Sequence, residues 1–166
     1  MVLETVMDPE IPVVSIRELG ILREINEREG LLEVVITPTY SGCPAIGQIE
    51  DDVRAALAAD GLSATVVTRL APAWTTDWIS DAAREKLRRY GIAPPGAANG
   101  LAAQRNEAVG KVVRIARRAP GALRNIGCPR CGSSNTTETS HFSSTACKAL
   151  YKCLACLEPF DYFKPF

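Results

Sequence analysis

Two pairs of cysteines constrain the fold of this chain more than any other feature of its sequence. Cys128 and Cys131 form one C-x₂-C pair, and Cys153 and Cys156 form a second, with 21 residues between the pairs. Each pair makes a tight turn that presents two thiolates to one ion, and four thiolates in a tetrahedron favour zinc. A segment this small buries little apolar surface, so a metal that holds it together is expected. The spacing predicts a zinc ribbon over residues 125–166, ahead of two disulfides or a four-thiolate iron site.

Composition excludes several classes of protein. No apolar run approaches the roughly 20 residues of a membrane helix, and the first ten residues carry acidic but no basic side chains, unlike a secretory signal. Six cysteines without such a signal indicate thiols or metal ligands in a reducing compartment, so we expect a cytoplasmic protein with no membrane partner. His141 is the single histidine, which rules out a Glu-x-x-His di-iron site, and no Walker A or G-x-G-x-x-G motif occurs. The chain is therefore not expected to be an enzyme by itself.

The composition changes along the chain and suggests three parts. We expect a first domain over residues 1–92, an Ala/Arg/Pro-rich linker over residues 93–124 and the ribbon from residue 125, because Pro94 and Pro95 cannot continue a helix. A linker of this length would let the two domains move semi-independently, unless aromatic side chains of the ribbon dock on the first domain.

The zero net charge conceals an asymmetry. Residues 1–83 hold 5 basic and 14 acidic side chains, a net charge of −9, whereas residues 84–124 hold 10 basic and 2 acidic side chains, a net charge of +8. Scattered arginines in a solvated linker explain the basic part, and a docking surface for an acidic partner or nucleic acid is the alternative. Nucleic-acid binding through the zinc ribbon and the basic linker is a third and weaker hypothesis for the function, because the acidic first domain would repel a phosphate backbone.

Hydrophobic periodicity predicts a small α+β domain in the first part of the chain. Apolar residues spaced by two predict strands, and those spaced by three and four predict helices. The expected elements are strands at residues 21–27, 32–36 and 62–70 and helices at about residues 44–59 and 75–90. Their order, α-β-β-α-β-α with a leading helix, indicates helices on one face of a three-stranded sheet.

Cys43 is the candidate functional residue of the first domain. Proline is favoured at the first helical position, so Pro44 would place Cys43 at the N-cap of the predicted helix. A thiolate there faces unpaired backbone N–H groups and the positive end of the helix dipole, which should lower its pKa and raise its affinity for metal. The alternative is a buried cysteine that acts as a small apolar residue.

Two other segments of the first domain carry unusual residues. Residues 8–12 predict a rigid turn in which two prolines fix the backbone and the carboxylates of Asp8 and Glu10 point outward. The segment 74–78 holds two tryptophans, which more often cap a core than bind a ligand. We expect Cys43 to lie partly exposed and within reach of one of these segments.

The ribbon holds six of the ten aromatic residues. Their number suggests that part of its surface docks on the first domain or on a partner. Cys147 falls outside the four-cysteine pattern and is expected to be a packed thiol, with a ligand or reactive role as the alternative. His141 is expected to be a strand residue, since four thiolates already close the metal site.

Several motifs resemble known families. Residues 8–12 (DPEIP), 18–21 (ELGI) and 41–44 (SGCP) resemble the iron–sulfur cluster assembly domain of the SufT and cytosolic targeting type. Residues 72–80 (PAWTTDWIS) and the tail over residues 128–164 resemble the PaaD family, also called PaaJ, the D component of the phenylacetyl-CoA epoxidase system. The resemblance covers both domains and leaves out the linker.

The PaaD resemblance implies a role in aerobic phenylacetate degradation, where the ring of phenylacetyl-CoA is epoxidised. It implies an accessory protein that assists metal-centre assembly, with the reductase or another iron-containing epoxidase component as partner. Transferred by position, Cys43 would transiently handle iron or an iron–sulfur cluster, Asp8 and Glu10 would line the same site, and the ribbon cysteines would hold structural zinc. The alternative is a non-catalytic interaction protein that stabilises the epoxidase complex and does not need the Cys43 thiol. A homo-oligomer is compatible with both hypotheses.

Overall fold

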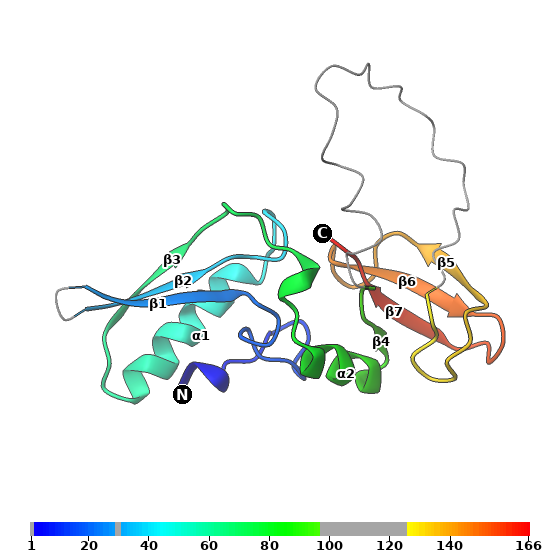
Figure 1. Ribbon diagram of the computed structural model, residues 1–166, viewed down its shortest axis with the longest axis horizontal. Coiled ribbons are helices and arrows are strands. Elements are labelled where there is room, and N and C mark those ends of the chain that lie inside the picture. Colours follow the sequence, from blue (N-terminus) through cyan, green and yellow to red (C-terminus); the bar gives the residue numbers. More distant parts are fainter. Residues whose placement is uncertain (1, 29–30, 97–125) are drawn as a thin grey trace, which may run out of the picture.

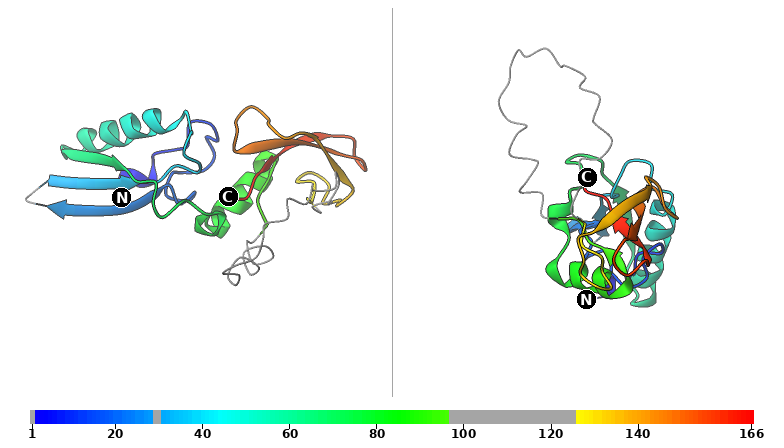
Figure 2. Two further views of the ribbon diagram at one scale, coloured as in Figure 1. Left: turned by 90° about the horizontal axis from the view of Figure 1, so that it is seen from above. Right: turned by 90° about the vertical axis from the view of Figure 1, so that its right-hand side faces the viewer.

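The computed structural model describes residues 2–28, 31–96 and 126–166 (Figure 1). The turn at residues 29–30 and most of the expected linker lie outside the described residues. The described chain is elongated, with one sheet toward each end and the helix α2 (Asp81–Tyr90) between them (Figures 1 and 2).

The first sheet has the strand order β1-β2-β3. β1 (Leu22–Arg28) and β2 (Leu31–Ile36) form the antiparallel hairpin that the sequence predicts. β3 (Ala64–Thr68) pairs with β2 in parallel. The two parallel strands are connected through α1 (Ile46–Ala59), which crosses one face of the sheet (Figure 2).

The buried face of α1 is the one that the sequence predicts. Ile49, Val53 and Leu57, spaced by four residues, share a hydrophobic core with Val34 and Ile36 of β2. Burying a side chain of this size stabilises the fold by about 1.5–3 kcal/mol. This packing fixes α1 against the sheet and therefore fixes the loop that precedes it.

The α+β class is confirmed, but the predicted order of elements differs at both ends of the first domain. The first element is a three-residue 3₁₀ turn, η1 (Val2–Glu4), instead of an α-helix. The predicted last helix is divided into a 3₁₀ turn, η2 (Thr76–Trp78), and α2. Ser80 causes the break, because its backbone is extended and its hydroxyl accepts the N–H of Ala83 at 3.1 Å as an N-cap.

The expectation that the helices share one face of the first sheet is wrong for α2. This helix lies beyond the end of the sheet, beside β4 (Ile92–Ala93) (Figure 1). Gly91 ends α2 and leads the chain directly into β4, which keeps the helix next to the second sheet. Among the described residues, no helix is both long enough and apolar enough to cross a membrane.

The second sheet has the strand order β4-β7-β6-β5. β5 (Thr136–Ser140), β6 (Lys148–Cys153) and β7 (Pro159–Phe163) are antiparallel neighbours. β4 adds to this sheet in parallel with β7. The boundary expected between residues 92 and 93 therefore lies within a strand that belongs to the sheet of the ribbon.

Aromatic side chains of the ribbon dock on the first domain. The ring of Phe163 lies 6.0 Å from that of Trp74, and the ring of Phe166 lies 6.3 Å from Trp74 and 6.0 Å from Tyr40. The indole N–H of Trp74 donates to the carbonyl of Leu19 at 3.0 Å, which fixes the ring. One hydrophobic core therefore runs from the first sheet into the ribbon, and this packed junction opposes the semi-independent motion that linker length alone would allow.

Gly20 packs closely against the backbone of Trp78 in η2. Its φ is +72°, and a Cβ atom there would lie 2.6 Å from Cβ and 2.8 Å from the carbonyl oxygen of Trp78. Gly61 has a similar φ of +73°, but a Cβ atom there would meet nothing within 4 Å, so Gly61 is the matched control. We expect Gly20→Ala to lower the free energy of unfolding by about 2 kcal/mol more than Gly61→Ala, since backbone must move. Urea unfolding followed by circular dichroism measures both variants, and equal losses would contradict this.

Candidate metal centres

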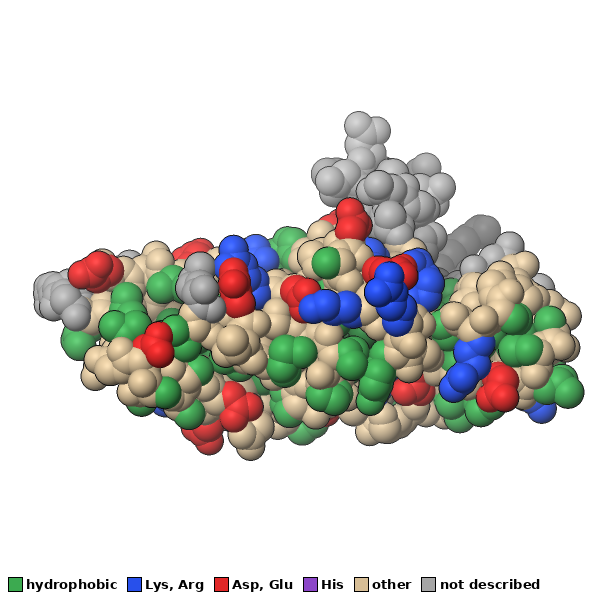
Figure 3. Space-filling view, turned by 90° about the horizontal axis from the view of Figure 1, so that it is seen from below, with side chains coloured by type: hydrophobic (Ala, Val, Ile, Leu, Met, Phe, Trp, Pro, Cys, Tyr) green, Lys and Arg blue, Asp and Glu red, His purple; other side chains and the backbone are tan. Residues whose placement is uncertain are grey.

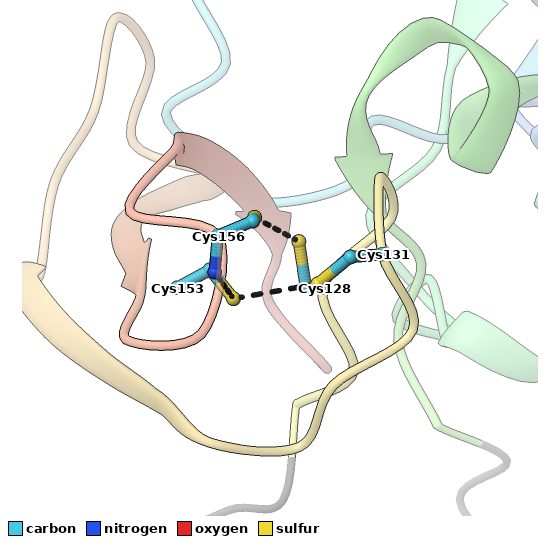
Figure 4. A group of neighbouring side chains, drawn as sticks. All are labelled: Cys128, Cys131, Cys153 and Cys156. Carbon is cyan, nitrogen blue, oxygen red and sulfur yellow. Dashed lines mark hydrogen bonds between the residues drawn. The ribbon is translucent and has the colours of Figure 1, made fainter.

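Four cysteines of the ribbon gather in one place (Figure 4). Cys153 ends β6, Cys156 lies in the turn that leads to β7, and Cys128 and Cys131 lie on the segment that precedes β5. Gly132, with a φ of +76°, lets the chain turn back, so that its N–H donates to the carbonyl of Cys128 at 2.9 Å. The two turns therefore face each other with their sulfur atoms inward.

The distances between these sulfur atoms fit a zinc ion. The Sγ atoms of Cys128 and Cys156 are 3.8 Å apart, those of Cys131 and Cys153 are 3.6 Å apart, and all four lie within 4.8 Å of one another. A tetrahedron with Zn–S bonds of about 2.3 Å places its sulfur atoms about 3.8 Å apart. Four thiolates leave no coordination position for a substrate, so zinc held here has a structural role.

Cys43 lies in the loop between β2 and α1, and the helix starts later than the sequence predicts. The helix begins at Ile46 with Ala45 in the cap position, so the prediction that Cys43 is the N-cap is wrong. The chain already turns at Pro44, but the first helical hydrogen bond joins the N–H of Ile49 to the carbonyl of Ala45. The N–H groups of Ala45 and Ile46 still act on the Cys43 sulfur and favour its thiolate.

The surroundings of Cys43 raise the pKa of its thiol, so the expected lowering is also wrong. Burial is the largest cause, and the negative charges of Glu10 and Asp8 add to it, against the N–H groups at the start of α1. The helix dipole is therefore outweighed by desolvation and by like charge. The side chain remains partly exposed, as expected. Since the thiol is protonated at neutral pH, a metal ion that binds it must displace a proton.

The acidic turn at Asp8 and Glu10 lies within electrostatic reach of Cys43. Asp8 is only 7% exposed, so the expectation that its carboxylate points outward is wrong. One of its oxygens accepts the N–H groups of Glu10 and Ile11 at 2.9 and 2.8 Å. These two hydrogen bonds lower the pKa of Asp8, but burial outweighs them and raises it. Burial and the negative charge of Asp8 together raise the pKa of Glu10. Folding thus places the carboxyl groups of Asp8 and Glu10 within electrostatic reach of Cys43.

Cys147 enters the same region from the ribbon, which sequence reasoning missed. It is buried, as a packed thiol should be, and its Sγ lies 3.0 Å from Oγ1 of Thr145 and 3.9 Å from Oε2 of Glu10. Burial raises the pKa of its thiol to about 11. The next residue, Lys148, is buried with its ammonium 3.6 Å from Asp161. No local spacing pattern connects Cys147 with Glu10, so the sequence offered no signal for this contact.

Three other side chains that the sequence singled out lie outside these centres. Trp74 packs in the shared core, and the guanidinium of Arg23 stacks 3.4 Å from the ring centre of Trp78. His141 is exposed just beyond β5, 3.2 Å from Glu138, and does not belong to the four-cysteine group. These residues serve packing and surface contacts.

Three of the four basic side chains of α2 pair with acidic side chains of the chain itself, and the fourth, Arg84, donates to the carbonyls of Thr76 and Pro95 at 2.6 Å each. Arg88 and Arg89 lie 2.9 and 3.0 Å from Glu85, and Lys86 lies 2.7 Å from Glu18. Figure 3 shows blue and red side chains interspersed on one face of the molecule. This described part of the basic segment therefore presents both signs of charge, unlike a surface built for a phosphate backbone.

Comparisons with known proteins match both parts of the chain. Residues 1–68 match the family model of an iron–sulfur cluster assembly protein, and residues 115–164 match that of the PaaD zinc beta ribbon domain. A protein of Escherichia coli (strain K12), provisionally named as the D component of 1,2-phenylacetyl-CoA epoxidase, is 44% identical over 163 residues, covering 98% of this chain and 88% of that protein. This chain belongs to the PaaD family. The resemblance seen in the sequence, with its assembly-type domain and zinc ribbon, is confirmed.

Other relatives of this PaaD family member match about half of the chain. The Bacillus subtilis (strain 168) protein YitW, named an Fe-S protein maturation auxiliary factor, is 35% identical over 89 residues, covering 53% of this chain and 80% of that protein. A crystal structure of a domain of unknown function, DUF59, from Bacillus anthracis aligns with a TM-score of 0.48 and 31% identity, covering 52% of this chain and 84% of that chain.

Proposed function

We propose that this chain is an accessory protein of phenylacetyl-CoA ring epoxidation. It assists the assembly of an iron or iron–sulfur centre in the reductase or another iron-containing component of the epoxidase. The observation that carries this proposal is a partly exposed Cys43 thiol within electrostatic reach of Asp8 and Glu10, in a domain matched by the iron–sulfur assembly family. Similarity over nearly the whole chain to a protein named as an epoxidase component supports the pathway, and similarity to a maturation factor supports the task.

In this proposal the site binds its iron cargo transiently. The Cys43 thiolate is a soft ligand of the kind that holds iron–sulfur units, and carboxylates suit iron as harder ligands. Because Cys43 and Glu10 are only partly buried, cargo can reach them from solvent or from a docked protein. The raised pKa of the Cys43 thiol means that cargo must displace a proton when it binds, which makes the bound state easy to reverse.

The ribbon has a separate role in the proposal. Cys128, Cys131, Cys153 and Cys156 hold a structural zinc, which stabilises the module that packs against the assembly domain. The chain performs no oxygen chemistry and no catalysis of its own. It works in the cytoplasm, where its thiols stay reduced, and its partner is a protein of the epoxidase and not a nucleic acid.

Replacing Cys43 in cells that depend on this chain for growth on phenylacetate tests the proposal. We expect Cys43→Ser to abolish growth on phenylacetate and to lower the iron content of the purified reductase component, because serine lacks the soft sulfur ligand. Ser41→Ala, an exposed change in the same loop, is the matched control and should support normal growth. Circular dichroism and zinc content establish that both variants fold.

A folded Cys43→Ser variant that supports full growth and normal iron loading would overturn the metal-handling function. The chain would then act as an interaction protein that stabilises the epoxidase complex. Size-exclusion chromatography of the wild-type chain, alone and with the reductase, distinguishes a homo-oligomer from a mixed complex.

A further inference from the structure

The contact between Cys147 and Glu10 joins two parts of the chain that the sequence keeps far apart. Glu10 belongs to the first domain and Cys147 to the ribbon, yet Sγ of Cys147 lies 3.9 Å from Oε2 of Glu10. The hydroxyl of Thr145, 3.0 Å from the same sulfur, holds the thiol in place. Glu10 also acts on Cys43 by its charge. The carboxylate of Glu10 thus contacts the Cys147 thiol of the ribbon and acts by its charge on the Cys43 thiol of the first domain.

Tyr40 supports the same arrangement independently. Its ring stacks on Phe166 of the ribbon, with ring centres 6.0 Å apart, in the shared core that also includes Cys147 and borders Cys43. The charges of Cys43, Cys147 and Glu10 all act on the Tyr40 phenol, and together with burial they raise its pKa. Both thiols and the carboxylate therefore lie within electrostatic reach of Tyr40 at the domain junction.

The charges in this region are unbalanced. Asp8 and Glu10 face both thiols, and burial raises the pKa of each of these four groups. Lys148 is the cation that acts on the two carboxylates and on Cys147, but it also lies 3.6 Å from Asp161. A cation that binds here would offset the negative charge of the two carboxylates.

We propose that Cys147 is a second thiol ligand of the cargo site, so that Cys43, Glu10 and Cys147 together bind an iron–sulfur unit at the junction between the domains. This inference rests on the proposed function of Cys43 and adds the ribbon to the site. Each thiol that binds iron forms an Fe–S bond and releases one proton, with no change of oxidation state.

The spacing of the ligands favours an iron–sulfur unit over a single ion. Among the described residues, the four ribbon cysteines are the one group of three or more ligands gathered closely enough to hold a metal ion. Cys43, Glu10 and Cys147 are therefore set wider apart than the ligands of one ion. An iron–sulfur unit, in which sulfide bridges several irons, takes thiolates on different irons, so its ligands need not converge on one atom.

Anaerobic loading of the full-length, zinc-containing protein with Fe²⁺ and sulfide tests this inference. Iron, sulfide and zinc per chain are counted, and the rate at which a chelator removes the bound iron is followed by absorbance. We expect Cys43→Ser to bind less than a tenth of the wild-type iron, and Cys147→Ser and Cys147→Ala to lose iron about tenfold faster or more. Glu10→Gln should lose iron several-fold faster, and Glu27→Gln, an exposed change on β1, should match wild type.

The outcomes distinguish failure of the shared site from failure of the proposed function of Cys43. If folded Cys147 variants load fully and release iron at the wild-type rate while Cys43→Ser fails to load, the shared site is wrong and the proposed function stands. If Cys43→Ser also loads and releases normally, both are wrong. Should neither Cys147 variant fold, Glu10→Gln decides, and its release at the wild-type rate would overturn the shared site. A wild-type protein that holds Fe²⁺ equally well without sulfide would overturn the assignment of an iron–sulfur unit.

Discussion

Removing zinc from this protein is expected to unfold the ribbon while the first sheet and α1 stay folded. The core that belongs to the ribbon alone is a small cluster around Tyr151 and Tyr162. A structural zinc held by thiolates contributes about 10 kcal/mol or more, and this binding energy is folding energy. The core between α1 and β2 contains none of the four zinc ligands, so it should persist after the ion has gone.

Trp74 should report the loss of the ribbon from the first domain. Its ring packs on Phe163 and Phe166, and both belong to the part that unfolds. We expect tryptophan emission to shift to longer wavelength and hydrogen exchange to accelerate over β6 and β7, but not over α1, when a chelator is added under reducing conditions. Adding zinc back is the control and should restore both signals. Slow exchange in β6 and β7 of protein shown by elemental analysis to lack zinc would contradict this prediction.

Phe163→Ala is expected to lower the free energy of unfolding by about 3–5 kcal/mol. The side chain is 1% exposed and lies in the core that the ribbon shares with the first domain. Truncation removes its apolar contacts and leaves a cavity beside Trp74, whose ring is fixed by its hydrogen bond to Leu19 and cannot easily move to fill the space. Both domains should therefore lose stability together.

Phe142→Ala is the matched control for that experiment. Phe142 is also a phenylalanine of the ribbon, but it is 60% exposed, so its truncation should change stability by less than about 0.5 kcal/mol. Urea unfolding curves of the two variants and the wild type give the comparison. Similar midpoints for Phe163→Ala and Phe142→Ala would mean that the junction contributes little to stability.

Features that depend on residues close in sequence were predictable. The two C-x₂-C pairs indicated the zinc ribbon, because each pair closes a turn over a few bonds. The spacing of Ile49, Val53 and Leu57 indicated the buried face of α1, because one helix places these residues on one side. Family motifs around Cys43 indicated the assembly domain for a similar reason, since each motif is a short continuous segment.

Local signals failed where two of them competed. Thr75 and Ser80 can each cap a helix, and only Ser80 accepts an N–H of the next turn in the folded chain. Pro44 suggested a helix start at Cys43, but the chain makes one more turn before α1 begins at Ile46. The residue at which a helix starts depends on whether its apolar face can then pack against the core. That packing involves the whole domain and cannot be read from the residues around the cap.

The tertiary structure alone decided the chemistry of the junction. The pKa of Cys43 rises because burial and the carboxylates of Asp8 and Glu10 outweigh the N–H groups of α1, and none of these neighbours is visible from the position of a helix start. Cys147 meets Glu10 across 137 positions of sequence because the ribbon docks through Phe163 and Phe166. The sequence by itself determined which residues could bind metal. Packing between the domains decided which of them lie near one another, because electrostatic and ligand interactions depend on distances in space, which spacing along the chain does not contain.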